Sequence, residues 1–443
     1  MSDATYDFAG IGIGPFNLGL ACLAEPIGGL KGIFLDQGER FNWHPGMLLQ
    51  SARLQTPFLA DLVTLADPTS PFSFLNYIKE RGRIYSFYIR ENFFLTRNEY
   101  NQYCQWAADR LSNLVFSTRV DWIDYSESQR CYLIRSTCTK SGEAKTHRAR
   151  KLVLGTGTVP YVPEACQGLM DKAIHSSSYL DRKRNLKNKR SITVLGSGQS
   201  AAEIYHDLLQ DIDEFGYELS WITRSPRFFS LEYNKLTLEM TSPEYVDYFH
   251  QLPADKRERL NQQQRNLYKG INGDLINDIY DLLYTKQLSN DIKVNLFTNS
   301  ELKKSAFDAA SGYFELDIFQ NEQEKHYRHY TEALILATGY SYRLPRFLEG
   351  IASRIRWDDQ GRFDASRNYS IDHQGSEIYV QNAELHTHGF VTPDLGMACY
   401  RNSCILLEMT GKEHYPVEKR IAFQQFAVPE VQISQPDPEL AAF

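Results

Sequence analysis

The chain has 443 residues, of which 48 are basic and 55 are acidic, and its formal net charge is -7. Because no basic excess is available to neutralise phosphates, nucleic acid is not expected as a partner. Hydrophobic residues make up 42% of the chain and aromatic residues 13%, which excludes wholesale disorder. The aromatic side chains would serve a packed core or a site that holds a flat ring, and composition does not distinguish these uses.

The N-terminal residues 1–7 are mostly polar and acidic, without the basic and apolar regions of a secretory signal. No apolar run of roughly 18 residues is present, so we expect no membrane span and a cytoplasmic location. The chain has 7 cysteines but no Cys-x-x-Cys pair. This spacing fits neither a disulfide framework nor a zinc site, so no metal is expected. It also argues against a flavin disulfide reductase, which needs a redox-active cysteine pair.

The first candidate site is a glycine turn near the N terminus, between a predicted strand and a predicted helix. It has the pattern Gly-x-Gly-x-x-Asn, formed by Gly12, Gly14 and Asn17. Glycines at these positions let the backbone approach a pyrophosphate, which the free N–H groups of the helix would bind. The next predicted strand ends at Asp36, where an acid suits the hydroxyls of a ribose. Pro15 and Asn17 depart from the usual fingerprint, so this motif alone is a weak signal.

A second turn of the same design lies in the middle of the chain. Gly196 and Gly198 follow an apolar segment and precede a predicted helix. The next predicted strand ends at Arg224, and an arginine there accommodates the 2′-phosphate of NADPH, whereas an acid would repel it. Arginines exposed in a loop are the alternative. Two such turns, one inserted in the middle of the chain, are the layout of a flavoenzyme that binds FAD first and NADPH second.

The remaining segments predict an α/β fold with parallel sheets, because short apolar runs alternate with helical stretches. Residues 151–158 and 333–340 each combine a strand with a glycine turn, and we interpret them as crossovers between two Rossmann-like dinucleotide-binding domains. Ordinary tight connections would have the same pattern. Residues 228–281 are polar and predict a small, mostly helical substrate domain. The expected division is an FAD-binding domain in two parts (1–160 and 339–443, including the tail), an NADPH-binding domain in two parts (161–230 and 280–338) and a helical insertion (231–279).

Three stretches also carry a resemblance to a known family. The first is the turn that runs from Gly12 to Asn17, with its Pro-x-Asn ending. The second comprises residues 41–47, 54–63 and 68–77, including a Trp-His-Pro-Gly-Met segment, and the third combines residues 337–340 with 386–389. Together they resemble the flavin-dependent N-hydroxylating monooxygenases of hydroxamate siderophore biosynthesis, which act on lysine, ornithine or diamines. The resemblance spans residues 6–410.

The resemblance implies a defined chemistry and a set of site residues. In this family NADPH reduces FAD, O2 adds to give a C4a-hydroperoxyflavin, and a neutral amine attacks the distal oxygen to leave a hydroxylamine. Gln55 and Asn17 are the expected catalytic residues. The expected cofactor-binding residues are Gly12, Gly14, Pro15, Phe16, Asn17, Asp36, Trp43, His44 and Gln55 for FAD, and Gly196, Gly198, Gln199, Ser200, Arg224, Thr338 and Gly339 for NADPH and the crossovers.

The chain departs from its amino-acid-using relatives at two positions. These relatives have a lysine within Phe-Leu-Lys-Asp-Leu and an asparagine before a Glu, and both contact the head group of the substrate. This chain has Ala60 and Leu238 instead. Because an unpaired buried carboxylate is costly, we expect a substrate without one, namely an aliphatic diamine such as cadaverine or putrescine. Glu239 and Glu244 are candidate partners of the distal ammonium, and Glu239, Asn266 and Gly396 are expected substrate contacts.

Several alternatives remain open. Lys235 or Lys269 from the insertion could replace the missing cation, which would favour an L-lysine N6- or L-ornithine N5-monooxygenase. The glycine turns do not define the acceptor, so another class B flavin monooxygenase or a dinucleotide sensor is also compatible. His386 and His388 have no matched third ligand, so a packing role is expected rather than a metal. The expected partners are a small diamine and O2, in a homo-oligomer (dimer or tetramer).

Overall fold

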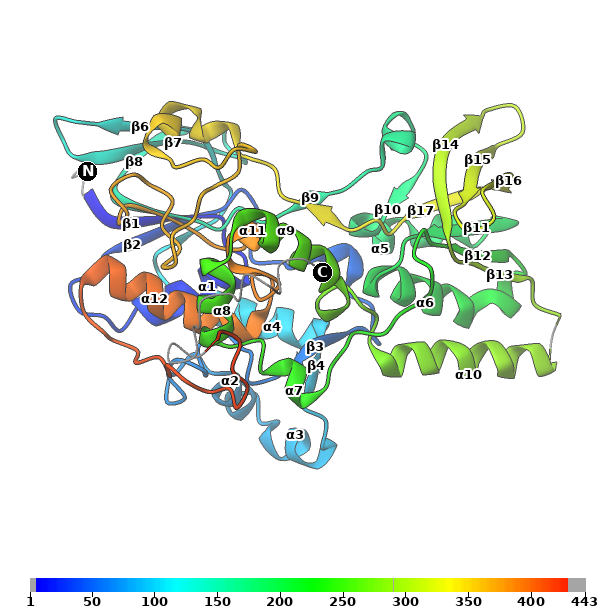
Figure 1. Cartoon of the computed structure of the whole chain (residues 1–443), viewed down its shortest axis with the longest axis horizontal. Coiled ribbons are helices and arrows are strands. Elements are labelled where there is room, and N and C mark those ends of the chain that lie inside the picture. Colours follow the sequence, from blue (N-terminus) through cyan, green and yellow to red (C-terminus); the bar gives the residue numbers. More distant parts are fainter. Residues whose placement is uncertain (1–4, 290, 429–443) are drawn as a thin grey trace, which may run out of the picture.

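The computed structural model describes residues 5–289 and 291–428, which form two α/β halves (Figure 1). The first half contains a 7-stranded sheet in the order β5-β2-β1-β8-β7-β6, with β19 paired to the last residues of β8. The strands at its centre, β1, β2 and β8, run parallel and end in continuous apolar runs, as strands buried on both faces require. The strands are β1 (Thr5–Ile11), β2 (Gly32–Leu35), β5 (Leu114–Val115), β6 (Thr118–Ser126), β7 (Cys131–Cys138), β8 (Ala144–Leu154) and β19 (Ile378–Val380).

Both faces of this sheet are covered. On one face, Phe8, Phe34 and Val153 pack with buried side chains of α1, α4 and α12. On the other face, Ile11 and Leu152 pack with the 3-10 helix η6. Proline at the first position of α1 suits a helix start, because its missing N–H would have no partner there. These helices are α1 (Pro15–Ala24), α4 (Arg97–Ala108), α12 (Ala398–Thr410) and η6 (Arg346–Arg354).

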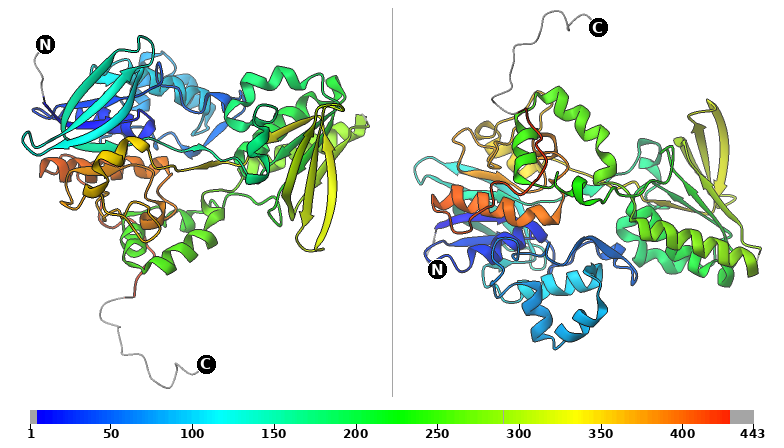
Figure 2. Two further views of the ribbon diagram at one scale, coloured as in Figure 1. Left: turned by 90° about the horizontal axis from the view of Figure 1, so that it is seen from above. Right: turned by 60° about the horizontal axis from the view of Figure 1, so that its bottom comes forward.

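The second half contains a 5-stranded parallel sheet in the order β10-β17-β11-β12-β13. Helix α6 packs between this sheet and α10, and ends where Gly216 adopts a left-handed conformation with φ of 69°. An antiparallel sheet of β14, β15 and β16 covers the opposite face (Figure 2). These elements are β10 (Ile174–His175), β11 (Ser191–Leu195), β12 (Glu218–Ile222), β13 (Val294–Phe297), β17 (Ala333–Leu336), β14 (Ser300–Asp308), β15 (Tyr313–Gln320), β16 (Lys325–Thr331), α5 (Tyr179–Arg182), α6 (Gln199–Phe215) and α10 (Gly273–Ser289).

The helices of the insertion interrupt the sequence of the second half but pack on the first half. Tyr245, Val246 and Phe249 of α8 form a cluster with Phe390 and Met397, which lie far along the sequence. The first half also contains the strand pair β3–β4 and two short helices, α2 and α3, of which α3 lies at the bottom of Figure 1. No helix of the described residues is long and apolar enough to cross a membrane. The elements are α7 (Lys235–Leu238), α8 (Pro243–Gln251), α9 (Ala254–Gln263), α11 (Leu385–His388), α2 (Phe74–Glu80), α3 (Ile84–Arg90), β3 (Arg53–Pro57) and β4 (Phe94–Thr96).

The chain crosses between the halves along a two-stranded ribbon of β9 (Val159–Pro160) and β18 (Tyr340–Ser341). The expected boundaries at 160/161 and 338/339 fall at this ribbon. The expected boundary at 279/280 falls inside α10, a helix that packs on α6. Residues 429–443 of the expected tail lie outside the described part of the chain. The predicted α/β class is confirmed.

Candidate active site

The first glycine turn connects β1 to α1. Gly12 has φ of 89°, and a Cβ there would lie 2.4 Å from the carbonyl oxygen of Gly155, so neither the conformation nor the space admits a side chain. A Cβ at Gly14 would meet no atom within 4 Å, which leaves open space before α1. The N terminus of α1 has no side-chain cap, so the N–H groups of its first turn are left without a side-chain partner from the cap residue. This geometry fits the pyrophosphate of a dinucleotide.

Asn17 lies behind the turn rather than in the open space. Its side chain is fully buried, its Nδ2 donates to the carbonyl oxygen of Gly12 at 2.7 Å, and its Oδ1 accepts from Gln381 Nε2 at 2.7 Å. A catalytic side chain must reach the reacting atoms, and Asn17 instead holds the turn against β8 and β19. The structure therefore supports a positioning role for Asn17, in place of the catalytic role expected from the sequence.

Asp36 lies at the end of β2 and braces the same turn. One carboxylate oxygen accepts from the N–H of Ile13 at 2.7 Å, and the other accepts from the N–H of Gly38 at 2.6 Å. Each carboxylate oxygen has a second lone pair. Asp36 can therefore orient the turn and still accept from a ribose hydroxyl, which stays a prediction.

The Trp-His-Pro-Gly segment forms one wall of a cavity between the halves. His44 has a left-handed φ of 49°, and its ring contacts those of Trp43 and Tyr340 at centroid distances of 4.9 and 5.3 Å. Burial, assisted by the nearby charge of Arg97, lowers the pKa of His44 to about 4. The imidazole is therefore neutral at physiological pH and presents a flat, uncharged surface to a ring.

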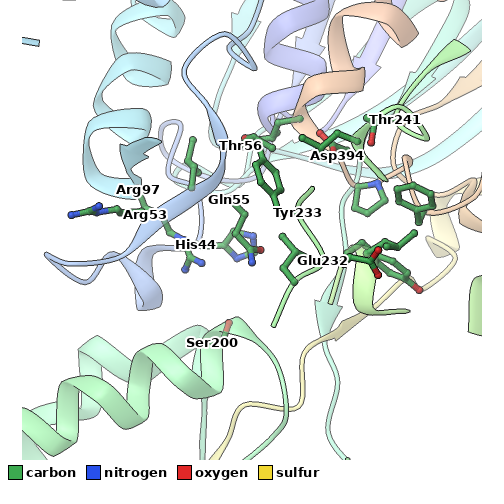
Figure 3. Close-up of a pocket in the computed structure, with 18 of the residues that line it drawn as sticks. His44, Arg53, Gln55, Thr56, Arg97, Ser200, Glu232, Tyr233, Thr241 and Asp394 are labelled. Atoms are coloured by element: carbon green, nitrogen blue, oxygen red, sulfur yellow. The ribbon is translucent and has the colours of Figure 1, made fainter. Parts of the chain in front are cut away.

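This cavity, called cavity I, has a volume of about 410 Å³ and receives side chains from both halves and from the insertion. Figure 3 shows Gln55 and His44 near its centre, with Arg53 and Arg97 on one side and Asp394 and Thr241 on the other. Its lining includes Trp43, His44, Arg53, Gln55, Arg97, Ser200, Glu232, Tyr233, Leu238, Thr241, Tyr268, Tyr340 and Asp394.

The second glycine turn has the geometry of the first. A Cβ at Gly196 would lie 2.2 Å from the carbonyl oxygen of Ala337, at the end of β17. At Gly198, which caps α6, a Cβ would meet no atom closer than 3.5 Å. The helix N terminus therefore again faces open space, as a second dinucleotide requires.

This space, called cavity II, has a volume of about 620 Å³ and is lined by Arg224, Arg265, Lys269 and Lys303. Burial and then the charges of Arg265 and Arg224 lower the pKa of Lys269, as expected for cations that crowd one place. Such a cluster suits the phosphates of NADPH, and the sequence pointed only to Arg224. Other predicted residues that line cavity II are Gly196, Gly198, Gln199, Ser200, Thr338 and Gly339.

Four side chains line both cavities: Gln55, Ser200, Tyr268 and Tyr340. Gln55 Nε2 donates to Gln199 Oε1 at 3.4 Å and to the carbonyl oxygen of Gly270 at 3.3 Å. A residue of the first half thus touches the N terminus of α6 in the second half. Groups bound in the two cavities would meet at this shared wall, which is the arrangement that hydride transfer needs.

The predicted substrate residues are not all brought together. Leu238 lines cavity I, whereas Ala60 is buried in the core of the first half. Asn266 donates to the carboxylate of Glu232 at 2.8 Å, and Gly396 donates its N–H to Asp394 at 2.6 Å. Asn266 and Gly396 therefore do not line cavity I themselves but contact residues that do.

Glu239 faces away from cavity I. Glu239 is not among the residues that line the cavity, and its carboxylate accepts from the N–H groups of Phe423 and Gln424, each at 3.0 Å, so its expected place beside the substrate ammonium stays a prediction without structural support. The acids that do line the cavity are Glu232 and Asp394, which the sequence did not single out. Asp394 follows a loop with no fixed spacing from the flavin turn, and only the fold brings it to the cavity.

Two helix-capping glycine turns with adjoining cavities define a flavoprotein that a nicotinamide dinucleotide reduces. The chain belongs to the L-lysine 6-monooxygenase/L-ornithine 5-monooxygenase family, because the sequence model of that family matches residues 4–342. It is similar to the putrescine N-hydroxylase of Shewanella oneidensis, with 56% identity over 422 residues, which cover 95% of this chain and 84% of that protein.

Two solved structures are also similar. The FAD-bound cadaverine monooxygenase DfoA of Erwinia amylovora is 63% identical, with a TM-score of 0.94 and coverage of 96% of this chain and 99% of that one. The ornithine N-hydroxylase of Kutzneria sp. 744, with reduced FAD, NADP+ and L-ornithine, is 28% identical, with a TM-score of 0.85 and coverage of 92% and 99%. The expected FAD- and NADPH-dependent N-monooxygenase acting on a small amine is confirmed.

Proposed function

We propose that the chain hydroxylates one primary amine of an aliphatic diamine, putrescine or cadaverine, as a first step of hydroxamate siderophore biosynthesis. One oxygen atom of O2 joins the amine nitrogen, the other leaves as water, and NADPH supplies the two electrons. Bound FAD supplies the oxygen-activating chemistry. The relatives named for putrescine and cadaverine support this substrate class.

The observation that carries the proposal is the position of the Asp394 carboxylate in the lining of cavity I. This carboxylate faces cavity I beside Thr241, across Gln55 from Arg53 and Arg97 (Figure 3). Ala60 and Leu238 offer no polar partner to a carboxylate. A substrate with an ammonium at its far end would find in Asp394 a charge-assisted hydrogen bond, and its apolar chain would lie along Leu238 and Tyr233.

The other side chains of cavity I have consistent roles. Trp43 and the neutral His44 would hold the flavin ring, and Gln55 would hydrogen-bond at its edge. The reacting amine must lose its proton before it can act as a nucleophile, and a cavity that excludes water lowers the pKa of an ammonium. The far ammonium keeps its proton because Asp394 is close.

The decisive test is product analysis. Hydroxylamine formed from cadaverine, putrescine, L-lysine and L-ornithine would be measured side by side, together with NADPH oxidation. We expect efficient hydroxylation of at least one diamine and little product from the amino acids. Efficient product from an amino acid and none from the diamines would reject the proposal.

The role of Asp394 as the partner of the substrate ammonium is tested with two variants of cavity I. Asp394→Asn removes the charge and should lower kcat/KM for the diamine by roughly tenfold or more, because a hydrogen bond to a charged group contributes about 1.5–3 kcal/mol. Glu232→Gln is the matched control, since Glu232 already accepts from Asn266 and Thr237. A larger effect of Glu232→Gln than of Asp394→Asn would place the ammonium at Glu232.

The alternative, an amino-acid substrate, is supported by one observation, because Arg53 lines cavity I and could pair with a carboxylate. Arg53→Gln separates the two functions. A diamine hydroxylase should keep its kcat/KM within about twofold, whereas an enzyme that binds an amino acid through Arg53 should lose roughly tenfold or more.

We further propose a cytoplasmic homo-oligomer, a dimer or tetramer. Exposed apolar side chains at helical spacing on α10, namely Tyr280, Tyr284 and Leu288, support a contact between copies of the chain. Light scattering after gel filtration would measure the mass, and a monomer at all concentrations would contradict the proposal.

A further inference from the structure

A buried ion pair connects the two halves beside the shared wall of the cavities. Arg97 begins α4 in the first half, and Glu203 lies on α6 in the second half. Their side chains meet at an Nη1–Oε2 distance of 2.9 Å, with exposed fractions of 13% and 4%. Pairs this deeply buried are rare unless each charge has its partner, since burying either alone is costly.

The pair is linked to the residues at the shared wall. The second carboxylate oxygen of Glu203 accepts from Gln199 Nε2 at 2.8 Å. Gln199 Oε1 in turn accepts from the N–H of Asn272 at 2.8 Å and from Gln55 Nε2 at 3.4 Å. A chain of contacts therefore runs from Arg97 through Glu203 and Gln199 to Gln55, leaving the first half and returning to it.

The chain of contacts restrains the N terminus of α6. Gln199 is the first residue of α6, and Ser200 lines both cavities. Glu203 is one helical turn further along on the same face. Fixing Glu203 to Arg97 and Gln199 to Gln55 therefore sets two points of the helix relative to the flavin half, which fixes both its distance and its rotation.

We infer that Arg97 and Glu203 are positioning residues for the reduction of the flavin. They hold the nicotinamide-binding turn at the distance from Gln55 that hydride transfer requires. Neither residue needs to touch the reacting atoms. The reductive step does not involve the amine, so the inference stands apart from the substrate proposed above, and the two can fail separately.

The primary variant is Glu203→Gln, which removes the charge and retains a side-chain oxygen that can accept from Gln199. Asp213→Asn is the matched control, because Asp213 lies on the same helix and pairs with Lys286, away from both cavities. The rate of flavin reduction at saturating NADPH would be measured anaerobically by the loss of flavin absorbance, with FAD content and reduction by dithionite as checks on the holoenzyme.

We expect Glu203→Gln to slow flavin reduction by NADPH about tenfold or more, since small misplacements of reacting groups can cost up to about 100-fold. FAD content and dithionite reduction should be unchanged, and Asp213→Asn should reduce its flavin like the parent enzyme. A reduction rate for Glu203→Gln within twofold of the parent would overturn the inference.

A double variant distinguishes positioning from stability. Arg97→Met with Glu203→Met removes both charges, and therefore leaves no unpaired charge buried. If the pair positions α6, this variant should keep its thermal stability near that of the parent and still reduce its flavin slowly. If the pair only stabilises the fold, the variant should regain the parental reduction rate together with its stability, and the inference would be wrong. The double variant also decides the matter if Glu203→Gln does not fold.

Discussion

Asp394 ties the substrate affinity of the enzyme to pH. Burial raises the pKa of this carboxyl, although the N–H of Gly396 and the charge of Arg401 oppose the shift. The group binds an ammonium only when ionised, so binding is complete above its pKa and is lost as the pH falls through it. The raised pKa moves this loss to a higher pH than for an ordinary aspartate.

We therefore expect the KM for cadaverine or putrescine to rise as the pH falls through the raised pKa of Asp394. The far ammonium of the diamine stays protonated throughout, because its pKa is about 10. Steady-state KM measured against pH checks this. In Asp394→Asn the acidic limb should disappear, and its persistence there would assign it to another group.

Arg224 should set the preference for NADPH over NADH. It lines cavity II where the strand β12 ends, and an arginine suits a 2′-phosphate. Arg224→Ala should raise the KM for NADPH roughly tenfold or more and leave the KM for NADH unchanged, since only NADPH has that phosphate. Lys303→Gln, a change in the same cavity, is the comparison variant. Equal increases of the KM for NADPH and for NADH in Arg224→Ala would contradict the assignment.

At this scale the sequence was informative where residue type and chain position are linked. The two glycine turns precede the N termini of α1 and α6, as their strand–turn–helix pattern indicates, and Gln55 and Leu238 line cavity I. The position of Glu239 could not be predicted in the same way, because it directly follows α7, and a helix of four residues carries too little periodicity to show which side chains face the cavity.

At the scale of elements, the C-terminal segment of residues 421–424 supports the cavity wall. Glu239 and Glu244 accept from the backbone N–H groups of this segment, and Gln424 donates to the carbonyl oxygen of Leu236. Phe426 packs edge-on against Tyr245 at a centroid distance of 5.1 Å. The segment thus holds α7 and α8 together, and α7 carries Leu238.

Replacing both carboxylates, Glu239→Gln with Glu244→Gln, should loosen this segment and α7. We expect the KM for the diamine to rise several-fold while the rate of flavin reduction by NADPH stays unchanged, because the NADPH turn is untouched. Glu413→Gln, an exposed change in the preceding residues, should have no effect on either quantity. A parental KM in the double variant would show that α7 is held by other contacts.

The elements themselves were predicted unevenly. Strand–turn–helix units with buried parallel strands stand out because their apolar runs are continuous, as in β11 and β17. The sheet of β14–β16 has no comparable signal, since it alternates exposed Lys, Glu and His with a few apolar residues. Helix α10 begins inside the polar insertion although it packs on α6, so composition alone did not show where the insertion ends and the NADPH-binding domain resumes.

At the scale of the whole molecule, the two halves differ in how their elements are distributed along the sequence. The second sheet and its helices lie within residues 174–336, apart from the insertion. The first half is completed only late, since Gln381 reaches Asn17, Asn402 reaches the carbonyl oxygen of Phe16, and Tyr415 reaches that of Leu23.

This difference has a consequence for biosynthesis. During translation the nicotinamide half has its complete sheet while the flavin half still lacks β19 and α12, and domains fold as units as they emerge. The contact between Asn17 and Gln381 joins residues 364 apart in the sequence, so it can form only after most of the chain has been synthesised. We therefore expect a nascent chain to bind its flavin only near the end of synthesis, after the nicotinamide site has formed.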